Sequence, residues 1–327
     1  MIHVVVLLIT EDDVPSLIDI PAAVEQMESA FRELARGRVL TPNRVTISIP
    51  QSYGTVRLMP SVLLDSEASG FKVLTGTAGQ RRAGRSYFLV TLLDYEDGSV
   101  QCIMSASRLT QIRTGAVSAL ATKYLARKAS RSFGLVGAGL QGQGQVEAIC
   151  STMKPSQVLI YDHSKQKASL MADGVRAAFG VDARAVDTVD EAVAADVVAT
   201  STTSTSPVLN VSNIAPGTHI NAIGSNTPAR KEIDPGLLRA SKVVVDLRDQ
   251  ALQESGDLEP VRRGELPADT IYGELAEIVA GSKPGRTSET EITIFKSVGI
   301  ALQDIAIAKF LYERALAKGI GRNIELQ

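Results

Sequence analysis

Cysteine and histidine are scarce in this sequence of 327 residues, which contains only two cysteines and three histidines. Cys102 and Cys150 are too few to build a disulfide framework, and no C-x-x-C pair or Cys/His cluster indicates a metal site. We interpret both as small core residues. The histidines occur singly, which argues against a histidine-rich zinc site, and for His219 a structural role is favoured over a catalytic one. We therefore expect no bound metal ion.

Long apolar runs and an excess of either charge are also lacking. The apolar run near the start, Val4–Ile9, is far shorter than the ~20 residues that span a bilayer, and it lacks the basic start and cleavage site of a signal peptide. Lys and Arg total 34 and Asp and Glu total 36, so no bulk charge attracts nucleic acid or an anionic membrane. With 44% apolar residues, the composition predicts a cytoplasmic globular protein. Its length suggests roughly two domains.

The pattern of apolar residues changes along the chain. The first third predicts a strand at Val4–Ile9, a helix from Thr10 to Gly37, and then several short strands separated by turns. From residue 132 onward, strands alternate with helices, which is typical of βαβ units and a parallel sheet. A last strand at 291–299 precedes a long amphipathic helix at 300–317. The predicted fold class is α/β, with a doubly wound parallel sheet and a second, α+β domain.

A glycine pattern begins this alternating region. The apolar strand 133–136 leads directly into Gly137, Gly139 and Gly142, and a helix follows. In a dinucleotide-binding turn the first glycine permits the tight turn, the second lets the backbone approach a pyrophosphate, and the third allows close packing of helix and strand. The N-terminus of the helix then offers free N–H groups to the phosphates. A ligand-free glycine turn is the alternative.

An acidic residue stands at the position where such a turn predicts one. Asp162 follows Gly142 by 20 residues, at the end of the next predicted strand. A carboxylate there can hold the ribose hydroxyls of the adenosine and repels a 2′-phosphate, so we expect NAD as the cofactor. Lys165 and Lys167 lie close by, and NADP is therefore not excluded.

Several stretches in order along nearly the whole chain resemble the ornithine cyclodeaminase/mu-crystallin family. They include "RLMPSVLL", "GFKVLTGTAGQ", "LTQIRTGAVSALATKYLAR", "GLVGAGLQGQ", "GTHINAIGSNTPARKEID" and "EITIFKSVGIALQDIAIA". The resemblance implies a substrate-binding and dimerisation domain made of residues 1–115 with 305–327, and a Rossmann domain at 116–304. It also implies a homodimer, and nicotinamide chemistry at the α-carbon of an amino or imino acid.

The resemblance also assigns roles to single residues. Lys72 lies where the family has its active-site lysine, and Arg113 matches an arginine that contacts the substrate carboxylate or the cofactor. Arg44 and Arg57 are similar in position to carboxylate-binding arginines, although each could equally be a solvated residue at a strand edge. Asn226 replaces a family aspartate that acts as acid and base near the substrate amine, and an amide cannot take up a proton.

Asp304 in the final helix allows two interpretations, burial at a domain or subunit contact or a hydrogen bond to the active site. The expected cofactor-binding residues combine the glycine turn with positions implied by the resemblance. They are Ser86, Arg113, Thr114, Gly137, Gly139, Leu140, Gln141, Gly142, Asp162, Thr200, Ser201, Ile223, Ser297, Val298 and Gly299.

Three functions remain open at this point. The leading hypothesis is an NAD(P)-dependent oxidoreductase that reduces an imine, or oxidises an amine, next to a carboxylate. It would use Lys72 and Asn226 as catalytic residues and Arg44, Arg57 and Arg113 for the substrate. The second is a cyclodeaminase, a lyase that uses bound NAD without net redox change, which Asn226 argues against. The third is a mu-crystallin-like binding protein without turnover.

Overall fold

The computed structural model describes residues 4–50, 54–76 and 87–326, and its chain divides into two compact units. Unit 1 comprises Met1–Arg113 and Ile300–Gln327, and unit 2 comprises Thr114–Gly299. One division falls inside helix α4 (Ser107–Leu125), and the other falls just before helix α12 (Ala301–Lys318). Residues 300–304, which the sequence analysis gave to the Rossmann domain, belong to unit 1 because α12 packs on the sheet of this unit.

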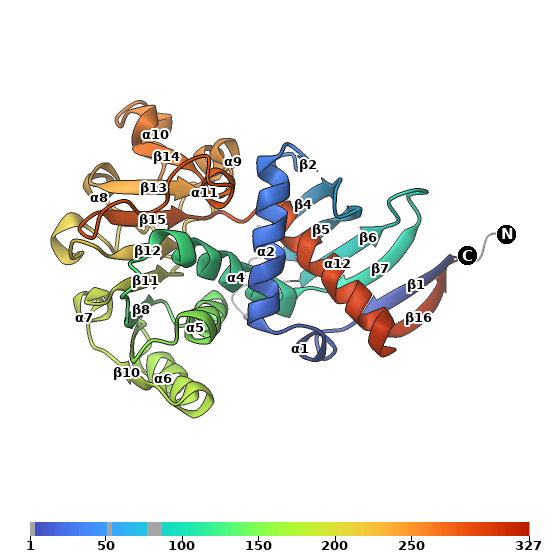
Figure 1. Ribbon diagram of the computed structural model, residues 1–327, viewed down its shortest axis with the longest axis horizontal. Helices are drawn as coiled ribbons and strands as arrows, with labels where there is room; N and C mark the ends of the chain where they lie inside the picture. Colours follow the sequence, from blue (N-terminus) through green and yellow to red (C-terminus); the bar gives the residue numbers. More distant parts are fainter. Residues whose placement is uncertain (1–3, 51–53, 77–86, 327) are drawn as a thin grey trace. The chain divides into compact units, whose positions relative to one another are not determined.

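Unit 1 is built on a mixed sheet of eight strands in the order β16-β1-β7-β6-β5-β4-β2, with β3 paired to β4. Strand β1 pairs antiparallel with β16 and parallel with β7, so segments from the two ends of the chain lie side by side (Figure 1). The other pairs are antiparallel. The strands are β1 (Val4–Ile9), β2 (Val39–Leu40), β3 (Val45–Ile49), β4 (Gly54–Leu63), β5 (Ala68–Gly76), β6 (Tyr87–Leu93), β7 (Val100–Ser105) and β16 (Arg322–Leu326).

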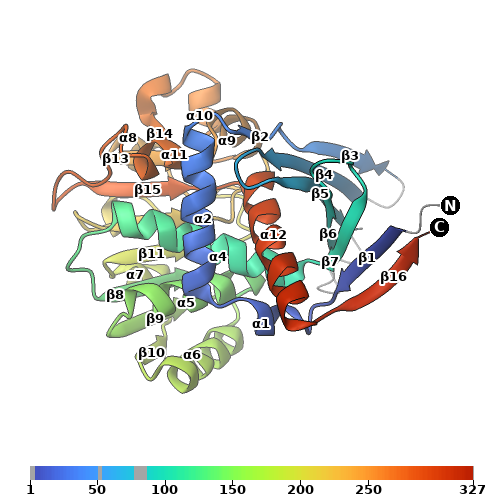
Figure 2. The ribbon, with the colours of Figure 1, turned by 45° about the vertical axis from the view of Figure 1, so that its right-hand side comes forward.

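Helix α12 covers one face of this sheet, against β4, β5 and β6, and α2 (Ile20–Ala35) packs against α12 (Figure 2). Because side chains alternate between the two faces of a strand, Met59, Lys72 and Val90, which pair across β4, β5 and β6, share the face under α12. All three are buried, whereas their neighbours Leu58 and Leu89 on the opposite face are 39% and 41% exposed. The fold therefore places a lysine on the buried face of a sheet.

The single helix predicted between Thr10 and Gly37 is wrong in one detail. The structure has two helices, α1 (Val14–Leu17) and α2, separated by an extended residue at Ile18. Each helix begins with a proline in its first turn, where the missing N–H costs nothing. Asp19 caps α2 by accepting a hydrogen bond from the backbone N–H of Ala22 at 2.9 Å. A proline that starts a second helix therefore explains the break.

Unit 2 contains a wholly parallel sheet of eight strands in the order β10-β9-β8-β11-β12-β15-β13-β14 (Figure 1). The chain starts in the middle at β8, winds outward through β9 to β10, and then crosses to β11 on the other side. This arrangement confirms the predicted doubly wound α/β fold, and it puts the switch point between β8 and β11. The strands are β8 (Ser132–Val136), β9 (Gln157–Tyr161), β10 (Asp182–Ala185), β11 (Val197–Thr200), β12 (His219–Ala222), β13 (Ser241–Val245), β14 (Ile271–Glu274) and β15 (Ile292–Lys296).

Central strands of unit 2 such as β11 are buried along their whole length, as expected for a parallel sheet covered on both faces, whereas the edge strand β10 is mostly exposed. The connecting helices are α5 (Leu140–Met153), α6 (Lys165–Phe179), α7 (Val189–Val193), α8 (Pro235–Arg239), α9 (Arg248–Glu254), α10 (Glu259–Arg262) and α11 (Leu275–Val279), with short 3₁₀ turns at Val211–Asn213 and Ala268–Thr270. Among the helices of the described residues, none is long and apolar enough to cross a membrane.

Candidate active site

Lys72 is the most buried cation among the described residues of unit 1, with 1% of its surface exposed. Its Nζ donates hydrogen bonds to Thr110 Oγ1 of α4 and to Asp304 Oδ1 of α12, both at 2.7 Å. The ammonium also lies 5.2 Å from the centre of the Phe88 ring, within the range of a cation–π contact. Strand β5 and two helices thus hold this side chain in one place.

Arg113 and Gln303 extend the cluster around the same carboxylate. Arg113 Nε lies 3.3 Å from Asp304 Oδ1, and its Nη1 donates a hydrogen bond to Gln303 Oε1 at 2.6 Å. Asp304 and Gln303 come from the first turn of α12 and are fully buried. Within the described part of the chain, Asp304 Oδ2 and Gln303 Nε2 are buried without a hydrogen-bond partner. Unpaired buried polar atoms are costly, so they mark a place where a further polar molecule would be favourable.

The surroundings of Lys72 change its acidity. Burial, together with the charges of Arg113 and Arg44, lowers the pKa of Lys72, whereas Asp304 opposes this fall by its charge and its hydrogen bond. The net effect is a pKa lowered from 10.5 to about 8. The result is an ammonium that can lose its proton close to neutral pH. A group with such a pKa is suited to donate a proton in catalysis.

Of the two other predicted carboxylate-binding arginines, Arg57 lies on the same face of the sheet as this lysine, and Arg44 acts on it through its charge. Arg57 pairs with Leu74 across β4 and β5 in the same alternation as Met59 and Lys72, so it shares their face. Arg44 acts electrostatically on Lys72. Lys72 and Arg113 both contact the carboxylate of Asp304, and Arg44 and Arg57 add two further positive charges to unit 1. The named residues therefore leave an excess of positive charge that suits a small carboxylate.

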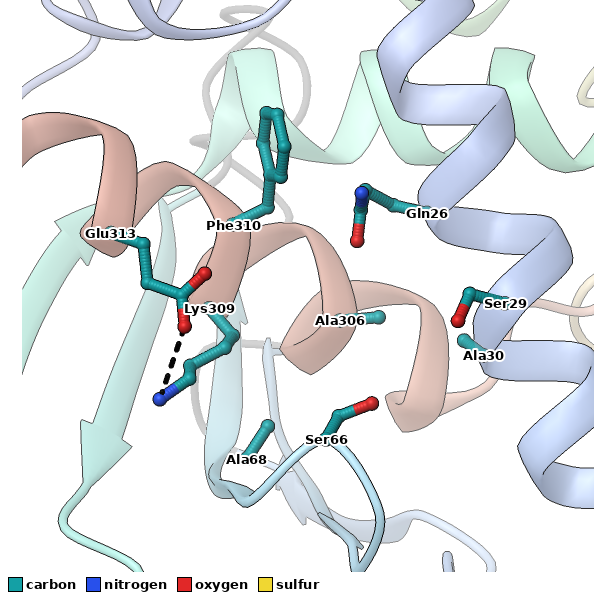
Figure 3. Close-up of a pocket in the computed structure, with 9 residues that line it drawn as sticks. All are labelled: Gln26, Ser29, Ala30, Ser66, Ala68, Ala306, Lys309, Phe310 and Glu313. Carbon is teal, nitrogen blue, oxygen red and sulfur yellow. Dashed lines mark ion pairs between the residues drawn. The ribbon is translucent and has the colours of Figure 1, made fainter.

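A cavity of about 220 Å³ lies elsewhere in unit 1, between α2, α12 and the turn that joins β4 to β5 (Figure 3). Its charged lining consists of Lys309 and Glu313, which form an ion pair with 3.4 Å between Nζ and Oε1. The two charges cancel, so this cavity offers no net attraction for a carboxylate, and the residues that line it do not include Lys72 or Arg113.

In unit 2, the glycine turn has the geometry of a dinucleotide-binding loop. Gly137 has a φ of +107°, which a side chain would strain, and a Cβ added at Gly142 would lie 2.1 Å from the Gly137 carbonyl oxygen. A Cβ at Gly139, in contrast, would meet no protein atom within 4 Å, and its φ of −90° suits any residue. The protein itself does not require glycine at 139. The space beside it, at the N-terminus of α5, fits a pyrophosphate. The helix begins with Leu140 and Gln141.

Asp162 lies directly after β9, beside this turn. Its Oδ2 accepts a hydrogen bond from the backbone N–H of Ala138, and its Oδ1 accepts one from Ser164, both at 2.8 Å. The carboxylate therefore fixes the glycine turn, and its position still suits the ribose hydroxyls of an adenosine. Lys165 forms an ion pair with Asp187, with 2.5 Å between the charged atoms, so its charge is balanced by a neighbour.

A buried glutamate organises two loops at the carboxyl ends of β11 and β12. Glu232 Oε1 accepts a hydrogen bond from Thr202 N at 2.7 Å, and Oε2 accepts from Gly224 N at 2.7 Å and from Thr200 Oγ1 at 3.0 Å. These loops carry predicted residues Thr200, Ser201 and Ile223. Ser201 Oγ donates to the Gly137 carbonyl oxygen at 2.8 Å, which joins the loop to the glycine turn.

Asn226 lies in the second of these loops. Arg230 Nη1 donates a hydrogen bond to Asn226 Oδ1 at 3.3 Å. An arginine can only donate hydrogen bonds, so the Asn226 amide oxygen is the acceptor of this bond. The amide N–H groups of Asn226 take no part in it and can donate to other groups.

Three further predicted residues, Ser297, Val298 and Gly299, are held by Asp246 at the end of β13. Asp246 Oδ2 accepts from the Ser297 hydroxyl and from the backbone N–H groups of Val298 and Gly299, at 2.7–3.0 Å.

The remaining predicted residues differ in where they lie. The side chain of Arg113 belongs to the Lys72 cluster, Thr114 is buried at the start of unit 2, and Ser86 lies outside the described residues. Sequence reasoning missed Gln303 and Glu232. Glu232 stands in the quoted stretch "NTPARKEID", but a glutamate in a polar loop carries no signal of burial.

Known proteins share this architecture over its whole length. The chain is 37% identical over 324 residues to Δ1-pyrroline-2-carboxylate reductase of Bacillus cereus, which covers 98% of this chain and 99% of the relative. The solved Δ1-pyrroline-2-carboxylate reductase of Thermococcus litoralis, in complex with NADH and L-proline, superposes with a TM-score of 0.94 at 38% identity and covers 97% of this chain and 100% of its own. An archaeal alanine dehydrogenase dimer with bound NAD gives a TM-score of 0.93 at 35% identity, with 99% and 100% covered.

The Rossmann unit, the buried cationic cluster and these relatives define the class as NAD-dependent oxidoreductases acting on carbon–nitrogen bonds. The chain belongs to the ornithine cyclodeaminase/mu-crystallin family, whose model matches residues 4–319. The resemblance inferred from the sequence is confirmed, and NAD, the predicted cofactor, is the one bound in these solved structures.

Proposed function

We propose that this chain reduces small cyclic α-imino acids with NADH, with Δ1-pyrroline-2-carboxylate as the reference substrate. The observation that carries the proposal is the buried Lys72 ammonium, held by Asp304 and Thr110 beside Arg113. The full-length similarity to two Δ1-pyrroline-2-carboxylate reductases supports this substrate class.

Arg113, with Arg44 or Arg57, holds the substrate carboxylate in this proposal. A guanidinium binds a carboxylate with two parallel hydrogen bonds, which fixes the orientation of the molecule as well as its position. The positive charge of the cluster offsets the cost of bringing the carboxylate out of water.

Lys72 donates the proton that the imine nitrogen needs, and NADH, when bound, supplies the hydride to the α-carbon. A protonated imine accepts a hydride more readily than a neutral one, so proton donation contributes directly to the rate. A pKa of about 8 keeps Lys72 largely protonated at neutral pH and still lets it lose the proton.

Asn226 is proposed to hydrogen-bond the substrate nitrogen. Its amide N–H groups can donate to a neutral imine, but they cannot take up or release a proton. Cyclodeamination requires repeated proton transfers at an amine, whereas reduction of an imine requires one. This difference favours net reduction over a lyase reaction.

The cofactor site in our proposal is formed by the glycine turn and the surrounding loops of unit 2. Gly139 and the first N–H groups of α5 receive the pyrophosphate, and Asp162 receives the adenosine ribose. Ser86 and Thr114 remain hypotheses for contacts with the cofactor phosphates, and Ser297, Val298 and Gly299 for contacts with the nicotinamide.

Absorbance of the reduced nicotinamide tests this function. Purified protein would be offered NADH with pyrroline-2-carboxylate or piperideine-2-carboxylate, and in parallel with pyruvate, glyoxylate, oxaloacetate or 2-oxoglutarate plus ammonia or methylamine. We expect consumption of NADH with the cyclic imino acids. Turnover only with a keto acid and an amine would change the substrate class. Ammonia release from ornithine without net NADH change would indicate a cyclodeaminase, and cofactor binding without turnover a binding protein.

We also propose a cytoplasmic homodimer. The face of the unit 1 sheet opposite α12 exposes Val45, Ile47, Leu58, Tyr87 and Leu89, each between 39% and 59%. A contiguous apolar face of this kind is typical of a surface that associates with another protein. A second copy of this chain is the occupant we propose, because the alanine dehydrogenase relative was solved as a dimer. Buried free thiols at Cys102 and Cys150 are compatible with a reducing compartment.

A further inference from the structure

Asp304 is a buried carboxylate whose surroundings point to a function beyond packing. It is 0% exposed, and its Oδ1 lies 2.7 Å from Lys72 Nζ and 3.3 Å from Arg113 Nε. It also lies in the first turn of the 18-residue helix α12, where the helix dipole stabilises a negative charge. Two cations and a helix N-terminus therefore surround this buried carboxylate.

The groups that act on the Lys72 charge come from every element around it. Strands β4 and β6 contribute the apolar Met59 and Val90 as its neighbours in the sheet, and β6 also contributes the Phe88 ring. Helix α4 contributes Thr110 and Arg113, and Arg44 adds a third positive charge. Of these groups, the arginines oppose the ammonium, and Asp304 on α12 favours it.

We propose that Asp304 is the positioning residue of this site, which keeps Lys72 protonated and fixes the direction in which its ammonium points. The proposal deepens the proposed reductase function and rests on it. In the proton step, an N–H bond of Lys72 breaks and an N–H bond forms at the imine nitrogen. Lys72 is left as a neutral amine, still hydrogen-bonded to Asp304 and Thr110, and a proton from water restores it. Asp304 gains no proton at any point.

The Asp304→Asn variant separates this role from a structural one. Asparagine keeps the size and one acceptor oxygen but removes the charge, so Lys72 should lose its proton at lower pH. We expect the alkaline fall of kcat to move down by ~1 pH unit or more, with kcat within a few-fold of the wild type at acidic pH. The matched control is Glu33→Gln. Glu33 is a buried carboxylate of α2 that accepts a hydrogen bond from Asp65 N at 2.7 Å. This control should leave the alkaline limb unmoved.

A second variant keeps the test valid if Asp304→Asn does not fold. Asp304→Glu preserves the charge but shifts the carboxylate, so kcat should fall while the alkaline limb stays near its wild-type position. A uniform loss of kcat at all pH values in Asp304→Asn, with an unmoved limb, would overturn the proposal. So would a limb that moves in Asp304→Glu.

A readout without turnover distinguishes failure of this inference from failure of the proposed function. Competitive labelling of lysines with acetic anhydride, followed by mass spectrometry across pH, reports the midpoint at which Lys72 becomes reactive. We expect this midpoint to fall in Asp304→Asn and to stay unchanged in Glu33→Gln. If the wild type reduces no imino acid but the midpoint moves as expected, the function is wrong and the role of Asp304 stands. An unmoved midpoint contradicts that role whatever the substrate.

Discussion

At the scale of single residues, burial decides what the Lys72 side chain can do. A lysine ammonium in water has a pKa of 10.5 and stays protonated near neutral pH. The Lys72 ammonium, buried between a sheet and two helices, has a pKa of about 8. The carboxylate of Asp304 prevents a further fall. The pKa of Lys72 therefore depends mainly on the balance between its burial and its ion pair with Asp304.

Replacement of Lys72 by methionine should abolish most of the turnover. The thioether fills the space of the lysine stem but has no proton to donate, so we expect kcat to fall by ~10²-fold or more. NADH binding, followed by nicotinamide fluorescence, should be unchanged. Lys123→Met, at an exposed position of α4, is the control. Full turnover in Lys72→Met would refute the role of this residue.

Asp162 is a second residue with a measurable effect. Both of its oxygens accept hydrogen bonds from backbone N–H groups beside the glycine turn, so Asp162→Ala should loosen the turn and remove the proposed ribose partner. We expect NADH affinity to fall by ~10-fold, in line with a charged hydrogen bond of ~1.5–3 kcal/mol, and NADPH affinity to fall less. Fluorescence titration with both coenzymes measures this, with the exposed Asp182→Ala as control. A wild type that already prefers NADPH would contradict the cofactor assignment.

Among the residues, those with a local pattern could be predicted, and their partners could not. The glycine turn and Asp162 follow from spacing along the chain, and Lys72 and Arg113 from short quoted motifs. The contact of Lys72 with Asp304 joins residues 232 positions apart. No periodicity or motif reports such a contact, because it depends on how α12 packs on the sheet.

At the scale of elements, apolar runs predicted most of the strands. The missed strands are short and polar, such as β10 (Asp182–Ala185), which has three exposed residues out of four. Its hydrogen bonds to β9, rather than its side chains, define it as a strand. The final strand β16 was also missed, since its pairing with β1 follows from tertiary structure.

The loops after β11 and β12 depend on one glutamate, which yields a prediction for these elements. Glu232→Gln keeps one acceptor but turns an NH₂ group toward backbone donors, Thr202 N–H or Gly224 N–H. We expect the free energy of unfolding to fall by ~1–3 kcal/mol and NADH affinity to fall with it. Denaturant unfolding and fluorescence titration measure the two effects, with the exposed Glu265→Gln as control. A variant as stable as the wild type would show that these loops do not need the carboxylate.

At the scale of the whole molecule, a buried neutral histidine makes stability depend on pH. Thr293 donates its hydroxyl proton to the Leu125 carbonyl oxygen, so His219 Nδ1 must donate to Thr293 Oγ1, at 2.9 Å. Burial lowers the pKa of His219 from 6.5 to about 3. Below pH 6.5, His219 is protonated in the unfolded chain but stays neutral in the folded chain. The free energy of unfolding therefore decreases as the pH falls from 6.5 toward 3.

The expected slope from this group approaches ~1.4 kcal/mol per pH unit well below 6.5. His219→Gln keeps a donor for Thr293 and should flatten this dependence between pH 6.5 and 4, as measured by denaturant unfolding. His163→Gln, at an exposed position, should not. Equal slopes in the wild type and His219→Gln would show that other groups cause the acid sensitivity.

The proposed dimer also belongs to this scale. Ile47→Asp places a charge on the exposed apolar face of the unit 1 sheet, and a charge buried at an interface without a partner is strongly unfavourable. We expect this variant to elute as a monomer in size-exclusion chromatography with light scattering. Leu170→Asp, at another exposed apolar residue on α6, should leave the dimer intact. A monomeric wild type would exclude the proposed association.

The interleaved course of the chain, with unit 1 formed from both of its ends, also sets an order of events during biosynthesis. All of unit 2 leaves the ribosome before α12 does. Unit 2 can therefore fold before Asp304 is available to pair with Lys72. At ~5–20 residues per second, the 232 residues between Lys72 and Asp304 take roughly 10 to 50 seconds to translate. A nascent chain that stalls in this interval would have a complete unit 2, while strand β5 with Lys72 would not yet be covered by α12. Such an exposed apolar strand is a natural target for chaperones.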